Sequence, residues 1–167
     1  LMGSDSLGRD IWSRTLYGGR VSITLGISVA LLAVFFGTVA GLLSGYFRWV
    51  DAVMMRVMDG FMSIPAILFA ISLIALVIVV TAIAIPSIPR IARLVRSVVL
   101  SVREEPYVEA AIALDTPVWK ILLRHILPNA TAPLIVQGTY VCAEAILVEA
   151  ILSFLGVGMP VEAATWG

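Results

Sequence analysis

The stretch YVEAAIALDTPVWKILLRHILPN, residues 107–129, combines charged side chains with apolar residues at helical spacing, between strongly apolar sequences. The helical positions recur every three or four residues in two groups: Val108, Ala111 and Ile112, then Val118, Ile121, Leu122 and His125. Between the groups, Pro117 suits the first position of a helix, and Asp115 or Thr116 can cap its free amides. The stretch predicts two short helices that meet at a corner, the second ending at Pro128 and Asn129.

The composition around this corner is that of an integral membrane protein. Of the 167 residues, 60% are hydrophobic and only 13% are charged, and the mean hydropathy is +1.05. Soluble domains are closer to one quarter charged. The single cysteine, Cys142, lies in an apolar run and excludes a disulfide or a multi-thiolate metal site within the chain. Leu1 opens without a cleavable signal pattern, which we interpret as a start part-way into a longer protein.

The first predicted span covers residues 21–47, which carry no charged side chain and exceed the roughly 20 residues that cross a bilayer. Residues 1–20 before it are polar and rich in glycine, and we expect a loop with one or two helical turns around Ile11–Tyr17. Within the span, Gly41 and Gly45 form a GLLSG pattern that lets helices approach closely in lipid. We expect this seam to pack within the chain rather than to form a dimer face.

Residues 48–63 predict a short amphipathic helix at the membrane interface, because Asp51, Met55, Met58 and Met62 follow helical spacing. Residues 64–89 form the next apolar run. Residues 48–63 and 90–124 hold most of the basic residues, and basic residues favour the cytoplasmic side. An even number of crossings should therefore separate these two stretches.

Two crossings need about 40 residues, more than residues 64–89 supply. We therefore predict spans at 64–76 and 81–103 with residues missing between Leu76 and Ala84. The arginines that follow, Arg93, Arg96 and Arg103, share a helical face and are expected to anchor this helix in the headgroup region.

The last long apolar run predicts a span at 130–156 and contains Gln137, Glu144 and Glu149. Carboxylates inside a membrane are costly and indicate function by default. We expect Glu149 to be buried against another helix near the external end and bonded to backbone or hydroxyl groups, in a structural or a pathway role. Glu144 is a candidate for a water-filled route at a partner interface, and Gln137 is a further pathway candidate.

Several motifs resemble one family in collinear order along nearly the whole chain. Glu109-Ala110-Ala111, followed by Leu127-Pro128, resembles the EAA loop of binding-protein-dependent ABC importer permeases. The segments DSLGRDIWSRTLYGGRVS (5–22), RHILPNA (124–130) and EAILSFLGVG (149–158) are similar to the peptide and nickel branch of that family. One position departs from the pattern: Asp115 stands where the family usually has glycine. Asp tolerates the left-handed conformation that a glycine would suit, so we expect the corner to form.

The resemblance implies an all-α, polytopic membrane protein of the type I ABC importer architecture, with about four of six spans present in this chain. Residues 1–20 and 159–167 would then be external, and residues 21–158 would form the permease domain. Residues 104–128 would form the cytoplasmic coupling segment, whose docking residues are Val108, Glu109, Ala110, Ala111, Ile112, Leu114, Asp115 and Thr116. In this picture Val108 and Ile112 supply apolar contact to the ATPase, and Glu109 supplies a charge.

The implied function is that of a transmembrane subunit in the bacterial inner membrane, importing di- or oligopeptides, with nickel or another small solute as the alternative. The implied partners are a second permease subunit, two ABC ATPase subunits that bind ATP and Mg²⁺, an external substrate-binding protein and membrane lipid. The chain itself has no GxxxxGK[ST] loop, paired-histidine metal motif or nucleophile elbow. We therefore expect a non-catalytic subunit without cofactor, metal or nucleic acid. An ion-coupled carrier or channel is the different-class alternative, but the inverted repeat of broken helices typical of such carriers is not found.

Overall fold

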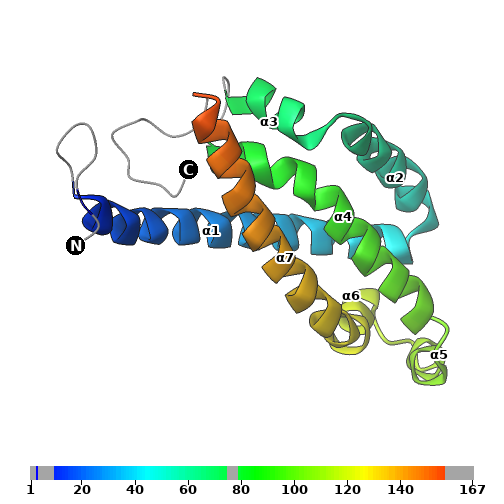
Figure 1. Ribbon diagram of the computed structural model, residues 1–167. Coiled ribbons are helices and arrows are strands. Elements are labelled where there is room, and N and C mark those ends of the chain that lie inside the picture. Colours follow the sequence, from blue (N-terminus) through cyan, green and yellow to red (C-terminus); the bar gives the residue numbers. More distant parts are fainter. Residues whose placement is uncertain (1–2, 4–9, 75–78, 157–167) are drawn as a thin grey trace.

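The computed structural model describes residue 3, residues 10–74 and residues 79–156, and the elements in these ranges are all helices (Figure 1). This arrangement confirms the predicted all-α class. The helices, in chain order, are α1 (Ile11–Tyr46), α2 (Arg48–Ser63), α3 (Ala66–Ile74), α4 (Val79–Val102), α5 (Pro106–Ala113), α6 (Val118–Ile121), the π-helix η1 (Leu122–Ile126) and α7 (Leu127–Phe154).

Helix α1 is the long axis of the molecule, and α4 and α7 cross it at different angles (Figure 1). It begins at Ile11, ten residues before the predicted span. The helical turns expected around Ile11–Tyr17 are present, but they continue into the span without the expected loop at residues 18–20. The start at Ile11 is due to a cap: the Asp10 carboxylate accepts hydrogen bonds from the backbone N–H of Trp12 and from the backbone N–H and hydroxyl of Ser13. The Ser13 hydroxyl bond is also the main reason why the pKa of Asp10 lies below its usual value.

A seam of glycines joins α1 to α4. A Cβ built at Gly41 would lie 2.6 Å from the Ala92 carbonyl oxygen and 2.6 Å from Val95 Cβ, and one at Gly45 would lie 2.5 Å from Val99 Cβ. Real Cβ atoms do not approach so closely, so the two backbones touch only because these positions lack side chains. The prediction that the GLLSG pattern packs within the chain is confirmed.

Helix α2 is fastened to α4 by two ion pairs. Asp51 accepts two hydrogen bonds from Arg96, one of them 2.6 Å from Nη2, and Asp59 pairs with Arg93. Arg93 and Arg96 therefore bind aspartates of α2, which are partners that the sequence did not predict. The Arg96 hydrogen bonds hold the pKa of the Asp51 carboxyl below its usual value of 3.8.

The apolar run of residues 64–89 is not one helix. It contains α3 and the first half of α4, which pack against each other and run in opposite senses (Figure 1). Of the interval between Leu76 and Ala84, where we predicted missing residues, residues 76–78 lie outside the described residues, and residues 79–84 belong to α4. From Val79, helix α4 continues through Pro86 and Pro89 without interruption.

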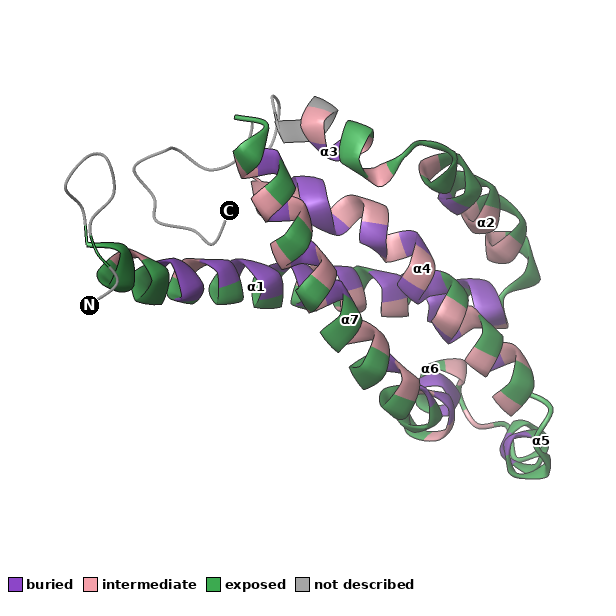
Figure 2. Cartoon of the chain, in the orientation of Figure 1, coloured by how far each residue is buried: buried purple, intermediate pink, exposed green. Residues whose placement is uncertain are grey.

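Two described helical stretches, Ile11–Tyr46 and Val118–Phe154, are long and apolar enough to cross a membrane by length and composition. Among the described residues, α3 covers 9 and α4 carries Arg90, Arg93 and Arg96, so neither helix meets this criterion there. Purple buried residues lie where helices face each other, and green exposed residues cover their outer sides (Figure 2). Many of these outer residues are large and apolar, among them Leu31, Phe35, Ile135 and Val136. Such a surface suits contact with lipid.

Candidate functional site: the α5–α6 corner

Helix α5 projects from one end of the molecule, beyond the last turn of α4 (Figure 1). The chain leaves α4 at Val102 and turns before Pro106, which stands in the first turn of α5, where a missing N–H costs no hydrogen bond. The predicted first helix of the corner is thus present.

The two sides of α5 differ sharply in burial. Val108 has no exposed surface and Ala111 is buried, whereas Glu109, Ala110 and Ile112 are exposed. Val108 packs with the central apolar cluster of the chain. The apolar contact expected between Val108 and a partner is therefore made inside the chain, and Ile112 is left as the outward apolar residue of that pair.

The end of α5 is a Schellman turn formed around Asp115. The Thr116 N–H donates to the Ala111 carbonyl at 3.1 Å, and the Asp115 N–H donates to the Ile112 carbonyl at 2.9 Å. Asp115 has φ +54°, the left-handed conformation usually taken by glycine. The prediction that Asp115 tolerates this turn is confirmed. The turn leaves Leu114 81% exposed at the tip of the corner.

The start of the second corner helix differs from the prediction. Pro117 is the N-cap residue of α6 rather than its first helical residue, and no side chain caps the helix. The expected cap by Asp115 or Thr116 is therefore wrong. The physical reason is that the N-cap position is taken by Pro117, whose ring carries no hydrogen-bond acceptor, so Thr116 and Asp115 lie one and two residues outside the capping position.

The second corner helix also does not end at Pro128 and Asn129. It passes through the π-helix η1 into α7, so that helix continues to Phe154. A proline inside an α-helix clashes with the carbonyl four residues earlier, and the wider π turn before Pro128 relieves this crowding. Isolated π turns in helices are frequent at functional sites. Of the predicted apolar face, Ile121 and Leu122 are buried, whereas Val118 and His125 are only half-buried. Ile126, which was not part of the prediction, is buried beside them.

A polar link ties the beginning of α5 to the beginning of α7. The Asn129 side-chain amide donates to the Tyr107 hydroxyl at 3.2 Å and to the His125 carbonyl at 2.6 Å. The rings of Tyr107 and His125 lie 6.2 Å apart. Sequence reasoning treated Asn129 only as a helix stop. The only indication of this contact in the sequence was that Tyr107 and Asn129 are the first and last residues of the corner stretch, 107–129.

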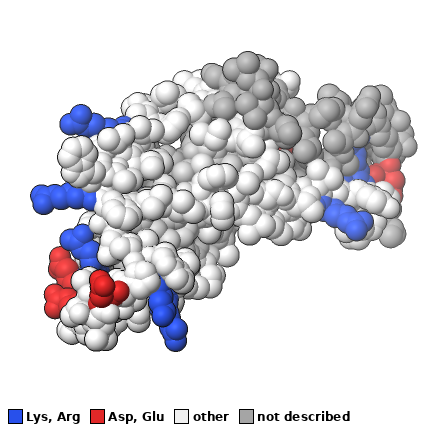
Figure 3. Space-filling view, turned by 180° about the vertical axis from the view of Figure 1, so that it is seen from behind, with Lys and Arg blue, Asp and Glu red and all other residues white. Residues whose placement is uncertain are grey.

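The outer surface of the corner is acidic and apolar together. In the space-filling view, acidic side chains gather at the end of the molecule that holds α5, with basic side chains beside them (Figure 3). The exposed acids are Glu104, Glu105, Glu109 and Asp115, and the exposed apolar residues include Ile112, Leu114 and Trp119. Such a mixture of anchoring apolar residues and charges is typical of a protein–protein contact.

The pathway candidate Glu144 is paired within the chain. Its Oε2 lies 2.6 Å from Arg90 Nη1, and the two side chains are 27% and 36% exposed. This pair joins α7 to α4 and borders a cavity of about 20 Å³ that Ser87 also lines. Sequence reasoning had placed Arg90 in the basic stretch beyond the membrane and so missed the pair.

Glu149 is fully buried in α7 and accepts a hydrogen bond from the Ser153 hydroxyl at 2.7 Å. Burial and bonding to a hydroxyl group are confirmed for Glu149, but only its Oε1 is bonded: Oε2 is buried and has no hydrogen-bond partner among the described residues. The hydroxyl comes from the next turn of the same helix. Gln137 is half-buried on α7, two turns before Glu144.

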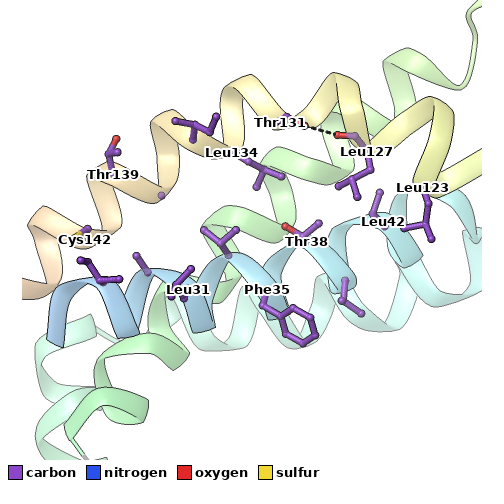
Figure 4. A pocket seen from close by; sticks show the side chains of 16 residues that line it. Leu31, Phe35, Thr38, Leu42, Leu123, Leu127, Thr131, Leu134, Thr139 and Cys142 are labelled. Atoms are coloured by element: carbon purple, nitrogen blue, oxygen red, sulfur yellow. Dashed lines mark hydrogen bonds between the residues drawn. The ribbon is translucent and has the colours of Figure 1, made fainter. Parts of the chain in front are cut away.

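An open apolar groove of about 830 Å³ lies between α1 and α7, and facing side chains from the two helices line it (Figure 4). Thr38, Thr131 and Thr139 are its hydroxyl-bearing residues. Thr131 donates its hydroxyl to the Leu127 carbonyl. Among the described residues there is no group of three or more His, Cys, Asp or Glu side chains able to hold a metal ion.

The family model for the inner membrane component of binding-protein-dependent transport systems matches residues 33–167. The chain belongs to this family. The match contains the α1–α4 glycine seam, the α5–α6 corner and α7, so these features lie within the matched region.

Curated relatives of this permease family match the chain along its whole length. A probable peptide ABC transporter permease of Sinorhizobium fredii is 51% identical over 99% of the chain and 58% of the relative. A dipeptide transport system permease of Alkalihalophilus pseudofirmus is 42% identical over 99% of the chain and 56% of the relative. A glutathione transport system permease of Pectobacterium atrosepticum is 41% identical over 99% of the chain and 57% of the relative. The chain thus spans somewhat over half the length of these relatives.

Proposed function

We propose that this chain is a multi-pass transmembrane subunit of an ATP-driven ABC importer in the bacterial inner membrane. It forms half of a translocation pathway for di- or oligopeptides, and a second homologous permease subunit forms the other half. Two ABC ATPase subunits bind and hydrolyse ATP with Mg²⁺, and an external binding protein delivers the solute. The chain itself is non-catalytic.

The observation that carries this proposal is the projecting corner. Its outer surface presents Glu109, Ile112 and Leu114, while Val108 and Ala111 hold α5 onto the rest of the chain. A short helix with one buried and one free side fits a role in which one side is fixed and the other docks on a partner. Ala110, exposed and small, allows close approach along the docking side.

The corner is suited to transmit movement because it is attached at both ends. α5 follows α4 after a short turn, and α6 continues through η1 into α7. The Asn129–Tyr107 hydrogen bond adds a direct connection between α5 and α7. Closure of the ATPase pair on nucleotide would displace α5 and, with it, both long helices.

Of the pathway candidates, Glu144 and Gln137 remain assigned to the solute route, and Glu149 is better supported in a structural role. Glu144 and Arg90 are partly exposed and offer opposite charges side by side. A peptide with free termini carries the same two charges. Glu149 is fully buried with a hydroxyl partner and is not accessible to a solute.

The proposed solute is a peptide because all three relatives above are named for peptide, dipeptide or glutathione transport. Nickel or another small solute is the alternative. The Arg90–Glu144 pair favours a zwitterionic solute, since a metal cation would find one of its carboxylate ligands neutralised.

The test is the Glu109→Lys variant in the complete importer, reconstituted in vesicles with its binding protein. Uptake driven by ATP should fall at least tenfold, and the ATPase subunits should co-purify less well, while peptide capture by the binding protein is unchanged. Glu104→Lys is the matched control, because it makes the same charge change in the turn before α5 and should have a smaller effect. Normal uptake by Glu109→Lys would refute the coupling role. Uptake driven by an ion gradient without ATP would refute the ABC class altogether.

A further inference from the structure

Helix α2 leaves one face without a partner in the described structure. Trp49, 91% exposed, and Arg56 lie two turns apart near the middle of this face, and Arg48 is exposed beside them. Val53 and Val57 are exposed on its flank. The opposite face carries Met54, Met55 and Met58 and packs against α1 and α4. The outer face is thus both basic and apolar.

The charges of α2 are sorted between its two sides. Both of its acids are neutralised by arginines of α4, Asp51 by Arg96 and Asp59 by Arg93. No ion pair of Arg48 or Arg56 occurs among the described residues. The unpaired charge of α2 is therefore positive, and an occupant of the outer face should be anionic.

The position of α2 along the molecule indicates what this occupant is. The candidate span α1 ends at Tyr46, and α2 begins at Arg48. Tyr46 and Phe47 pack edge to face with ring centroids 5.2 Å apart, and Trp49 follows at once. Aromatic clusters at the end of a span mark the level of the lipid headgroups, where amphipathic rings are favoured. Arginines at this level lie within reach of lipid phosphates.

We propose that the outer face of α2 binds anionic phospholipid, with Arg48 and Arg56 contacting headgroup phosphates and Trp49 inserted beside them. The aromatic cluster favours lipid over a protein partner as the occupant. An amphipathic helix of this kind lies with its apolar residues at the acyl boundary and its arginines among the headgroups. The contact would hold α2, and through its two ion pairs α4, at a fixed depth.

The test measures lipid selectivity at Trp49 itself. The full-length chain, with its other tryptophans replaced by phenylalanine, is reconstituted in phosphatidylcholine vesicles that contain dibrominated phosphatidylglycerol or dibrominated phosphatidylcholine. Quenching of Trp49 fluorescence gives the relative association constant of the two lipids at this site. A surface arginine is worth about fivefold in such a constant, and two arginines roughly 25-fold. Arg48→Gln/Arg56→Gln should abolish most of the preference for phosphatidylglycerol, and Arg48→Lys/Arg56→Lys should retain it.

Two controls keep the result specific to α2. Arg103→Gln removes an exposed arginine at the end of α4 and should leave the selectivity at Trp49 unchanged. A chain whose sole tryptophan is Trp119, in the corner, should show no comparable selectivity. Equal quenching by the two lipids, or a preference that survives the double glutamine variant, would overturn the proposal. Absence of quenching by either lipid would also overturn it, since protein would then cover the face. No ATP or peptide is involved, so the outcome is independent of the transport function.

Discussion

The glycine seam between α1 and α4 makes a quantitative prediction for Gly41→Ala. The new Cβ would meet the Ala92 carbonyl oxygen and Val95 Cβ at 2.6 Å. Ordinary van der Waals contact begins near 3.4 Å. The carbonyl belongs to the backbone of α4 and cannot rotate away, so the helices must separate locally. Overpacking of this kind costs about 1–3 kcal/mol.

A second effect acts in the opposite direction and is removed by a matched control. Replacing glycine by alanine inside a helix favours the helix by about 0.8–1 kcal/mol. Gly60→Ala in α2 receives the same gain, but its Cβ would meet nothing within 4 Å. The difference between the two variants therefore isolates the steric cost at the seam.

The assay is thermal unfolding of the purified chain in detergent, followed by the loss of the monodisperse peak in size-exclusion chromatography. For a chain of this size, 1 kcal/mol corresponds to roughly 2–4 °C in Tm. Gly41→Ala should therefore melt about 2–12 °C below Gly60→Ala. Gly138→Ala, whose Cβ would meet only Val34 Cγ2 at 3.3 Å, should fall between them. Equal Tm values for Gly41→Ala and Gly60→Ala would show that α1 and α4 are not in backbone contact.

Three further predictions concern charged groups. The pKa of Asp51 is lowered in the folded state, so the ionised carboxylate stabilises the fold fully above its usual pKa of 3.8 and loses this effect as the pH falls below 3.8. The Tm difference between the wild type and Asp51→Asn should therefore be constant above pH 3.8 and shrink below it. The charge-exchanged double variant Arg90→Glu/Glu144→Arg should recover at least half of the decrease in Tm that either single variant causes. A double-mutant cycle that shows no coupling energy would contradict the observed ion pair. Ser153→Ala should lower stability by about 1 kcal/mol because the buried Glu149 carboxylate loses its hydroxyl partner, whereas Ser153→Thr should be close to neutral in the same unfolding assay.

The features that could be predicted from the sequence are those set by local pattern. The glycine spacing at Gly41 and Gly45 predicted a close helix contact, and Asp115 in the place of a glycine predicted a left-handed turn. Both are confirmed, because a missing side chain or a positive φ constrains the residue itself. The burial of Glu149 followed from the cost of a carboxylate in an apolar span.

The features that could not be predicted depend on which helices become neighbours. Arg96 and Asp51 are 45 residues apart, and nothing local distinguishes an arginine that reaches lipid from one that reaches a second helix. Val108 and Ile112 are one turn apart and share a broad helical face, yet only Val108 is buried. The edge of the contact surface falls between them, and only the packing of α5 determines that edge.

The difference between the buried and the exposed residues of the corner also determines which substitutions test the coupling role without disturbing the fold. Val108 and Ala111 are buried, so their substitution would lower stability and reduce uptake indirectly. Glu109, Ile112 and Leu114 are exposed, and their substitution should leave the fold of the isolated chain intact, because exposed positions rarely change stability by more than about 0.5 kcal/mol. A loss of ATP-driven uptake at these three positions, with an unchanged Tm, can therefore arise only from the surface that α5 presents to a partner.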